Sequence, residues 1–224
     1  ALTGNQVLII DLDAQANLTL SLNIQPDTTK HNISDVLFRN LNPNMAVIQS
    51  RVENLFVLPS HPEVGLAERE LPKTDRFPHI LGDVVPQLSD MDYIIYDCPP
   101  AVGSVTLMAL IAADLMLIPT VSDYFSVFAL KKVLGITNKV NSYREIPLKY
   151  RVLITQMDLR LGSQKTIYKE LKNRLKNNLA KTVIPIDSKI RECPREGVPI
   201  THFKKSSRAS IAYKALAEEV ENII

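Results

Sequence analysis

The sequence predicts an α/β fold with a doubly wound, mostly parallel sheet flanked by helices. Short β-branched runs alternate along the chain with segments of helical period. Several of these runs are apolar on both faces, as expected for strands covered by helices on two sides. The chain has 224 residues, of which 46% are hydrophobic and 22% charged, enough for a sizeable core. We therefore expect one globular domain over residues 1–224.

Six runs have the composition of strands. They are Val7–Asp11, Leu55–Leu58, Tyr93–Asp97, Leu115–Ile118, Arg151–Thr155 and Thr182–Ile184. Loops are expected at Asn42–Asn44 and Pro59–Pro72, where turn-forming residues gather.

Six segments between the strands have helical periodicity. They are Ile33–Asn40, Pro78–Leu88, Val105–Ala112, Phe125–Tyr143, Ser163–Leu179 and Ser207–Ile224. The fifth is the clearest, because Ile167, Leu171, Leu175 and Leu179 recur every four residues on one face. Ser163 is suited to cap its first turn.

Composition excludes several classes of protein. The net charge of +2 is too small to indicate nucleic-acid binding by itself. Cys98 and Cys193 have neither metal-ligand spacing nor the pattern of a disulfide framework, which fits a reducing cytoplasm. The longest apolar run, Val105–Pro119, is interrupted by Thr106 and Asp114 and is too short to span a bilayer. We expect a cytoplasmic protein with no membrane partner.

Three carboxylates stand at the ends of two predicted strands. Asp11 and Asp13 follow the first strand, and Asp97 ends the third. Ligands of such sheets bind outside the carboxyl ends of the strands. A strand-ending Asp can hold Mg²⁺ where the ion bridges phosphate oxygens, although a single one is more often a turn or helix-cap residue. Three acids at two strand ends favour a chemical role, and Pro99–Pro100 fixes the backbone that leaves the third strand.

Motifs along the chain carry a family resemblance. D-L-D-A-Q-A-N, residues 11–17, resembles the D-L-D-P-Q-G-N signature of the ParA/Soj-type, or deviant Walker, partition ATPases. Y-I-I-Y-D-C-P-P-A-V-G-S-V-T-L-M-A-L, residues 93–110, resembles their Walker B and switch segment. V-I-P-I-D-S-K-I-R-E-C-P-R-E-G-V-P-I resembles the late strand and loop of the family, and S-S-R-A-S-I-A-Y-K-A-L-A-E-E-V its last helix. The resemblance covers nearly the whole chain.

The resemblance implies a P-loop NTPase-like fold of the SIMIBI/ParA type that binds ATP and Mg²⁺. By the same resemblance, Asp13 helps to position the attacking water, and Asp11 supports the site from the strand end. Asp97 contacts the magnesium shell, and Gln15 and Pro185 contact the nucleotide.

Two departures from the signature affect its backbone. Ala14 stands where the family usually has Pro, and Ala16 where it usually has Gly. These changes put the backbone placement near Gln15 in doubt.

A phosphate-binding loop is missing from the sequence. Such a loop, G-x-x-x-x-G-K-[S/T], needs glycine N–H groups to cradle phosphates and Lys to neutralise them. None of the seven glycines, at 4, 65, 82, 103, 135, 162 and 197, is followed by Lys. In the family this loop and its strand come before the strand that is Val7–Asp11 here, and Ala1–Gln6 resembles the end of the intervening helix. We therefore expect an N-terminally incomplete chain, and a relative that has lost the loop is the alternative.

Basic residues gather in two late segments. Residues 164–181 form a basic helix face, usually a solvated one, and Asp187–Arg208 forms a basic loop. In the family, basic residues of these late loops on both subunits of an ATP-bound dimer contact DNA without reading its sequence. The resemblance implies a DNA-binding set in which Arg191 matches best and Lys205 and Arg208 replace a later Arg that aligns with Ser206; the full set is Lys189, Arg191, Arg195, Lys205 and Arg208.

The function implied by the resemblance is that of a plasmid- or chromosome-partitioning ATPase. Such a protein is cytoplasmic and nucleoid-associated, binds DNA non-specifically as an ATP-dependent homodimer, and is released by hydrolysis that a ParB-like centromere-binding protein stimulates. Two alternatives stay open. One is a non-hydrolysing DNA-binding or scaffold relative without the P-loop. The other is a MinD-like positioning ATPase, which needs a basic amphipathic C-terminal helix, whereas Glu218, Glu219 and Glu221 stand near this C-terminus.

Overall fold

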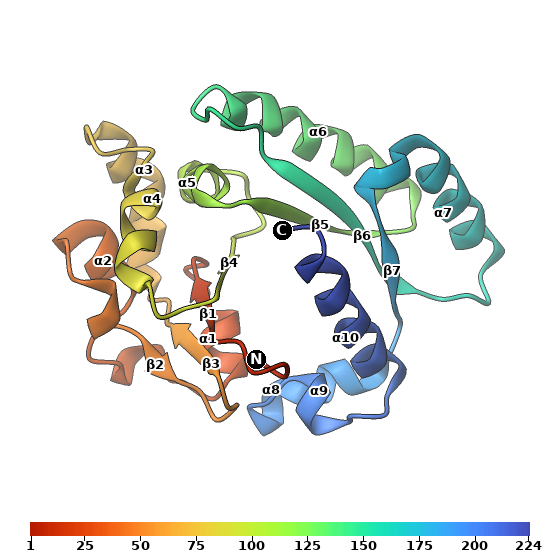
Figure 1. Ribbon diagram of the computed structural model, residues 1–224, viewed down its shortest axis with the longest axis horizontal. Helices are drawn as coiled ribbons and strands as arrows, with labels where there is room; N and C mark the ends of the chain where they lie inside the picture. The colour runs from red at the N-terminus through yellow and green to blue at the C-terminus, as the bar shows by residue number, and fades with distance from the viewer. The chain divides into compact units, whose positions relative to one another are not determined.

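The strands form two sheets, and each sheet belongs to one of two compact units. In this computed structural model, which describes all residues from 1 to 224, unit 1 comprises Ala1–Ala112 and Cys193–Val198, and unit 2 comprises Ala113–Glu192 and Pro199–Ile224. Figure 1 shows helices packed around the strands of each unit. The α/β class with mostly parallel sheets is confirmed, whereas a single domain over residues 1–224 stays a prediction.

The sheet of unit 1 has four strands in the order β2-β3-β1-β4. Their bounds are β1 Val7–Asp11, β2 Ile48–Gln49, β3 Leu55–Leu58 and β4 Tyr93–Asp97. β1 pairs in parallel with both β3 and β4, and the short β2 is antiparallel to β3. The register places Asp11 opposite Asp97, so the carboxyl ends of β1 and β4 lie side by side. The predicted bounds of β1, β3 and β4 are correct.

Short helices connect the strands of unit 1. They are α1 Asn17–Ser21, α2 Ile33–Arg39, α3 Ala67–Glu70, α4 Ile80–Val84, α5 Ser104–Ala112 and α8 Cys193–Glu196. The predicted helix Pro78–Leu88 is α-helical only over α4 and continues as a 3₁₀ turn at Val85–Leu88. Pro86 lies in that turn and has no N–H to continue an α-helix. The predicted loop Pro59–Pro72 is wrong in part, because it contains α3 and a 3₁₀ turn at Pro62–Leu66.

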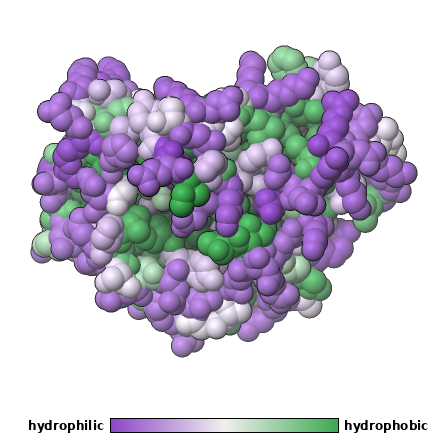
Figure 2. All heavy atoms as spheres, turned by 45° about the horizontal axis from the view of Figure 1, so that its top comes forward, coloured by the Kyte–Doolittle hydropathy of each residue, from purple (hydrophilic) through white to green (hydrophobic).

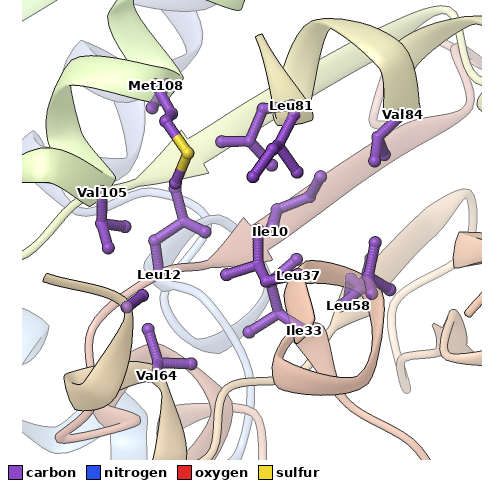
Figure 3. Packing of buried hydrophobic residues seen from close by; sticks show 14 of the residues in the cluster. Ile10, Leu12, Ile33, Leu37, Leu58, Val64, Leu81, Val84, Val105 and Met108 are labelled. Atoms are coloured by element: carbon purple, nitrogen blue, oxygen red, sulfur yellow. The ribbon is translucent and has the colours of Figure 1, made fainter. Parts of the chain in front are cut away.

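The core of unit 1 packs helices against the first strand. Ile10 and Leu12, at and just beyond the end of β1, lie among Leu58, Leu81 and Met108 (Figure 3). These side chains are at most 1% exposed. A close-packed core of this kind fixes the carboxyl end of β1, because even small shifts of well-packed side chains are costly.

The sheet of unit 2 has three parallel strands, β5 Leu115–Val121, β6 Lys149–Met157 and β7 Leu179–Pro185, in that order. All three are longer than predicted. Parallel pairing extends to residues such as Lys149, which lack the apolar pattern by which a strand is found in a sequence.

Four helices belong to unit 2, and Figure 1 shows α6 and α7 on one face of its sheet and α10 on the other. Their bounds are α6 Tyr124–Asn141, α7 Gly162–Leu175, α9 Ile200–Phe203 and α10 Arg208–Glu221. Leu216 of α10 packs on Leu153 and Ile184 of the sheet. Local caps begin two of these helices, because Asp123 accepts from the Ser126 amide and Ser207 accepts from the Ser210 amide.

Two details predicted for α7 are wrong. The helix begins at Gly162 after Leu161, and Ser163 does not cap it. It also ends at Leu175, because Lys176 adopts φ 48° and breaks the helical backbone. Leu179, assigned to the apolar stripe of this helix, is the first residue of β7.

The surface is largely hydrophilic in the face seen in Figure 2, with hydrophobic side chains gathered in a few patches. Among the exposed apolar side chains are Phe125 of α6 and Ile95 of β4, which is 52% exposed. No helix of the chain is long and apolar enough to cross a membrane.

Candidate active site

The three predicted carboxylates meet at one edge of the sheet of unit 1. Asp11 and Asp97 are opposite one another in the pairing of β1 with β4. The backbone of the two strand ends stays joined beyond this pair, because the Leu12 amide donates to the Asp97 carbonyl at 2.9 Å. Asp13 follows one residue later. The spacing of the acids in the sequence therefore predicts their meeting in space.

Asp11 is a buried anchor of the loop that follows β1. Its side chain is 0% exposed. One oxygen accepts from the Asp13 amide at 3.1 Å, and the other accepts from the Thr19 amide at 2.9 Å and the Thr19 hydroxyl at 2.7 Å. A carboxylate held by three donors inside a core orients its neighbours and has no solvent-facing oxygen for a reactant. Asp11, predicted in the catalytic set, thus has the geometry of a positioning residue.

Asp13 is partly exposed and is held through its backbone. Its carbonyl accepts from the Ala16 amide at 2.8 Å and from the Ser60 hydroxyl at 2.7 Å. Its Oδ1 accepts from the Gln15 amide at 3.0 Å. The Oδ2 atom has no protein partner, so it can accept a hydrogen bond from a small molecule such as water.

The backbone at Ala16 answers the doubt about the signature. Ala16 adopts the left-handed conformation, with φ 51° and ψ 32°, just before α1. This region favours Gly, which is the residue that the family usually has there. Ala16 thus adopts a conformation that favours Gly and in which Ala is strained, and Gln15 is exposed beside Asp13.

Thr19 and Ser60 complete the network and were missed in the sequence. The Thr19 hydroxyl donates to Asp11 and accepts from the Ser60 amide at 3.0 Å. The Ser60 hydroxyl returns to the Asp13 carbonyl. Both side chains are 0% exposed. Thr19 lies in the first turn of the helix after the signature, which is a signal that the sequence contains, but nothing in the sequence indicates Ser60.

Asp97 is the exposed member of the three acids. Partial burial of its carboxyl group, and then the negative charges of Asp11 and Asp13, raise its pKa above the ordinary value. Crowding of negative charge in this way favours a cation, which would relieve the repulsion. The chain contains no group of three or more His, Cys, Asp or Glu side chains arranged to hold a metal by themselves. A magnesium ion bound here would take most of its ligands from water and phosphate, as Mg²⁺ often does.

Cys98 follows Asp97, and its surroundings disfavour the thiolate form. Burial, and then the charge of Asp97, raise the pKa of its thiol to about 12, so the reactive thiolate is scarce at neutral pH. Cys193 is buried, and neither cysteine forms a disulfide.

A pocket of about 280 Å³ lies beside Asp13 in unit 1. Pro99 and Ala101–Gly103 of the β4–α5 loop, residues 98–103, form one wall, and Gly65 and Glu68 form another. Its walls are mainly apolar and carry two acids, Asp13 and Glu68. Glu68 is a further residue that had no signal in the sequence.

The predicted basic residues of the late loop differ in their surroundings. Lys189 pairs with Glu192 at 2.8 Å, and Arg208 donates to the Ile186 carbonyl at 3.1 Å. Arg191 is exposed in the 3₁₀ turn Ser188–Glu192 and has no protein partner. Lys205 is exposed. Burial, and then the charges of Lys205 and Lys214, lower the pKa of His202. These residues belong to unit 2.

Two further predicted residues complete the set. Arg195 is exposed in α8 and belongs to unit 1. Pro185 ends β7 in unit 2, directly before the late loop. The predicted roles of these residues stay predictions.

Comparison with known proteins shows the family. The model of an AAA domain family, AAA_31, matches residues 1–150. The sporulation initiation inhibitor protein Soj of Bacillus subtilis is 32% identical over 98% of this chain and 88% of its own length. The chromosome partitioning protein ParA of Myxococcus xanthus is 30% identical over 96% of this chain and 77% of its own.

A solved structure is similar to this chain in fold. Cobyrinic acid a,c-diamide synthase from Mycobacterium smegmatis, with bound ADP and magnesium, has a TM-score of 0.83 and 25% identity, covering 97% of this chain and 82% of that one. The sequence relatives, the signature around Asp13 and the meeting of the strand-end acids agree. The chain belongs to the ParA/Soj family of partition ATPases.

Proposed function

We propose that this protein hydrolyses ATP and uses the cycle to partition plasmid or chromosomal DNA. The observation that carries the proposal is the meeting of Asp11, Asp13 and Asp97 at one sheet edge, with one acid buried, one partly exposed and one exposed. Three different surroundings suit three different roles in phosphoryl transfer, which depends on positioning and on charge stabilisation.

Asp97 is proposed to hold the magnesium shell. Burial is the larger cause of its raised pKa, but the charges of Asp11 and Asp13 also contribute and make a negative site that a divalent cation fits. The Asp97 residue is exposed, which leaves it accessible. Bound Mg²⁺ would neutralise charge on phosphate oxygens.

Asp13 is proposed to orient the attacking water through its unpartnered Oδ2. Asp11 keeps Asp13 in place by accepting a hydrogen bond from its amide. The hydrogen bonds of Thr19 and Ser60 fix the positions of both acids. Gln15 and Pro185 are proposed as nucleotide contacts because Gln15 is exposed beside Asp13 and Pro185 stands at a strand's carboxyl end.

The phosphate cradle is proposed to lie outside these 224 residues. No Gly–Lys pair occurs in the chain. β4 ends the sheet of unit 1, yet Ile95 in its middle is apolar and 52% exposed. An apolar strand with an unpaired edge is suited to pair with one more strand, and that strand would carry the loop.

DNA binding is proposed to require a homodimer with ATP bound, and to run through the late basic loop. Arg191 and Lys205 are exposed, and backbone contacts need only cations aimed at phosphates. A ParB-like centromere-binding protein is proposed to stimulate hydrolysis and so release the DNA. These steps would take place in the cytoplasm, at the nucleoid.

ATP turnover by the full natural chain tests the proposal. Asp13→Ala should slow turnover by roughly 10²–10⁴-fold, as for loss of a positioned acid or base, and leave ATP binding intact. Asp27→Ala, at an exposed acid in a 3₁₀ turn, is the matched control and should turn over normally. Normal turnover in Asp13→Ala would remove Asp13 from the mechanism. No turnover in the unmodified protein would favour the non-hydrolysing scaffold.

A further inference from the structure

Glu68 of α3 caps the N-terminus of α5 from a distant part of the chain. Its Oε2 accepts from the Ser104 amide at 2.5 Å, and its Oε1 accepts from the Val105 amide at 3.2 Å. The Ser104 hydroxyl also lies 3.4 Å from the Glu68 carbonyl. A carboxylate at the first turn of a helix interacts favourably with the unpaired amides and the helix dipole.

The residue that should supply the cap has no side chain. Gly103 is the N-cap of α5, because its carbonyl accepts the first helical bond from the Leu107 amide at 3.0 Å. A Cβ atom at Gly103 would collide with the Glu68 carboxylate. The backbone φ of Gly103 is not in the left-handed region, so the backbone does not require glycine, and the space that a Cβ atom would take is filled by the end of the flexible Glu68 side chain. Gly103, which has no side chain, therefore leaves room for the Glu68 carboxylate to cap α5.

Glu68 also holds the β4–α5 loop against the pocket beside Asp13. Within the loop, the Ala101 carbonyl accepts from the Gly103 amide and from the Thr106 hydroxyl, both at 3.1 Å. These two bonds are local. The hydrogen bonds of Glu68 tie the loop to α3, and Glu68 lines the same pocket as Asp13. The loop starts directly after Asp97.

We propose that Glu68 is a positioning residue of the site, which fixes the β4–α5 loop relative to Asp13. This inference rests on the ATPase function proposed above. The loop starts directly after Asp97 and lines the pocket beside Asp13, and small misplacements in an active site are costly. Capping α5 does not by itself need Glu68, because a local side chain at the N-cap could cap the helix. Holding the loop against α3 does need it.

A set of three variants separates capping from positioning. Glu68→Ala removes both. Gly103→Ser in the unmodified background displaces the Glu68 carboxylate from the amides of α5, whereas in the Glu68→Ala background the new hydroxyl can cap α5 locally. The two substitutions should therefore be strongly non-additive in urea denaturation, with a coupling of about 5- to 50-fold in the folding equilibrium constant.

The double variant Glu68→Ala/Gly103→Ser decides the matter. It should recover stability, yet kcat for ATP in the full natural chain should stay about 10- to 100-fold low with KM little changed. Amide hydrogen exchange of residues 98–103 should stay faster than in the unmodified protein, a readout that does not need ATPase activity. Glu70→Ala, on the same helix, is the control and should change neither kcat nor exchange.

Recovery of both kcat and slow exchange in the double variant would mean that Glu68 only caps α5 and would overturn the inference. Additive effects of the two substitutions on stability would overturn it as well. If the unmodified protein shows no turnover, the proposed function fails, and hydrogen exchange still decides whether Glu68 holds the loop.

Discussion

Thr19 gives two hydrogen bonds to the buried carboxylate of Asp11, from its amide at 2.9 Å and its hydroxyl at 2.7 Å. The same hydroxyl accepts from the Ser60 amide. One side chain thus joins the end of β1, the start of α1 and the loop after β3. The network holds Asp13 in place without contacting its free oxygen.

Replacing Thr19 with Val should destabilise unit 1 by about 2 kcal/mol. The substitution keeps the shape but leaves Asp11 short of one donor and the Ser60 amide without its acceptor, in a place with no access to water. Urea denaturation measures the change. Thr19→Ser keeps the hydroxyl and should lose less than half as much. Equal losses in both variants would show that the methyl group, and not the hydroxyl, stabilises the site.

Replacing Ala16 with Gly should stabilise the protein by about 0.5–1 kcal/mol. Gly removes the strain of a left-handed alanine, and this gain exceeds the entropy that Gly adds to the unfolded chain. Ala14→Gly is the matched control, because Ala14 has no positive φ and should lose stability by a similar amount. Thermal or urea denaturation of both variants tests the opposite signs. A loss in Ala16→Gly would mean that the turn is unstrained.

The sequence predicts where the site lies better than it predicts the residues that hold the site in place. The three acids could be found because an apolar run that ends in Asp is visible without a structure, and parallel strands bring their ends together. Thr19, Ser60 and Glu68 could not, because each acts through a contact with residues distant in the sequence. The sequence also does not distinguish a buried acid from an accessible one. Asp11 stands where a site residue is expected, and only its burial reveals a positioning role.

Replacing Asp97 with Asn should stabilise the protein at neutral pH. The folded chain raises the pKa of Asp97, chiefly through burial and then through the charges of Asp11 and Asp13. The folded state therefore binds the proton more tightly than the unfolded state, and ionised Asp97 opposes folding. The gain in Asp97→Asn should be complete above the raised pKa. It should vanish below the ordinary pKa of Asp, where both states are protonated.

Urea denaturation at several pH values measures this gain. Asp90→Asn, at an exposed acid without a partner, is the charge-matched control and should show little gain at any pH. A gain that does not change with pH, or one equal to that of the control, would contradict the electrostatic account. A gain in stability on replacing a residue is typical of one kept for its function and not for folding.

Element boundaries show what local pattern can and cannot predict. β1, β3 and β4 have the predicted bounds because their apolar runs end at a residue that marks a strand end, Asp in β1 and β4 and Pro59 directly after β3. α7 does not, because its apolar stripe continues in period four through Leu179, whereas the backbone breaks at Lys176 to start β7. The preference of Leu179 for its place in β7, where it is buried opposite Val152, overrides the helical pattern.

Arg191→Glu should abolish DNA binding and leave ATP turnover unchanged in the full natural chain. Arg191 is exposed and unpaired, so its guanidinium can reach phosphates, whereas Lys189 is already paired with Glu192. Binding of DNA by the unmodified protein should require ATP. The loss of affinity in the variant should be equal for duplexes of unrelated sequence. Milder changes to Ala at true contacts should each reduce the salt slope by about 1. Titration of labelled duplexes at several salt concentrations, with and without ATP, measures all of these.

Lys172→Glu on α7 makes the same charge change on the competing basic face and should bind DNA normally. Normal binding by Arg191→Glu with loss in Lys172→Glu would place the DNA contact on α7, and tight binding to a single sequence would indicate a specific repressor.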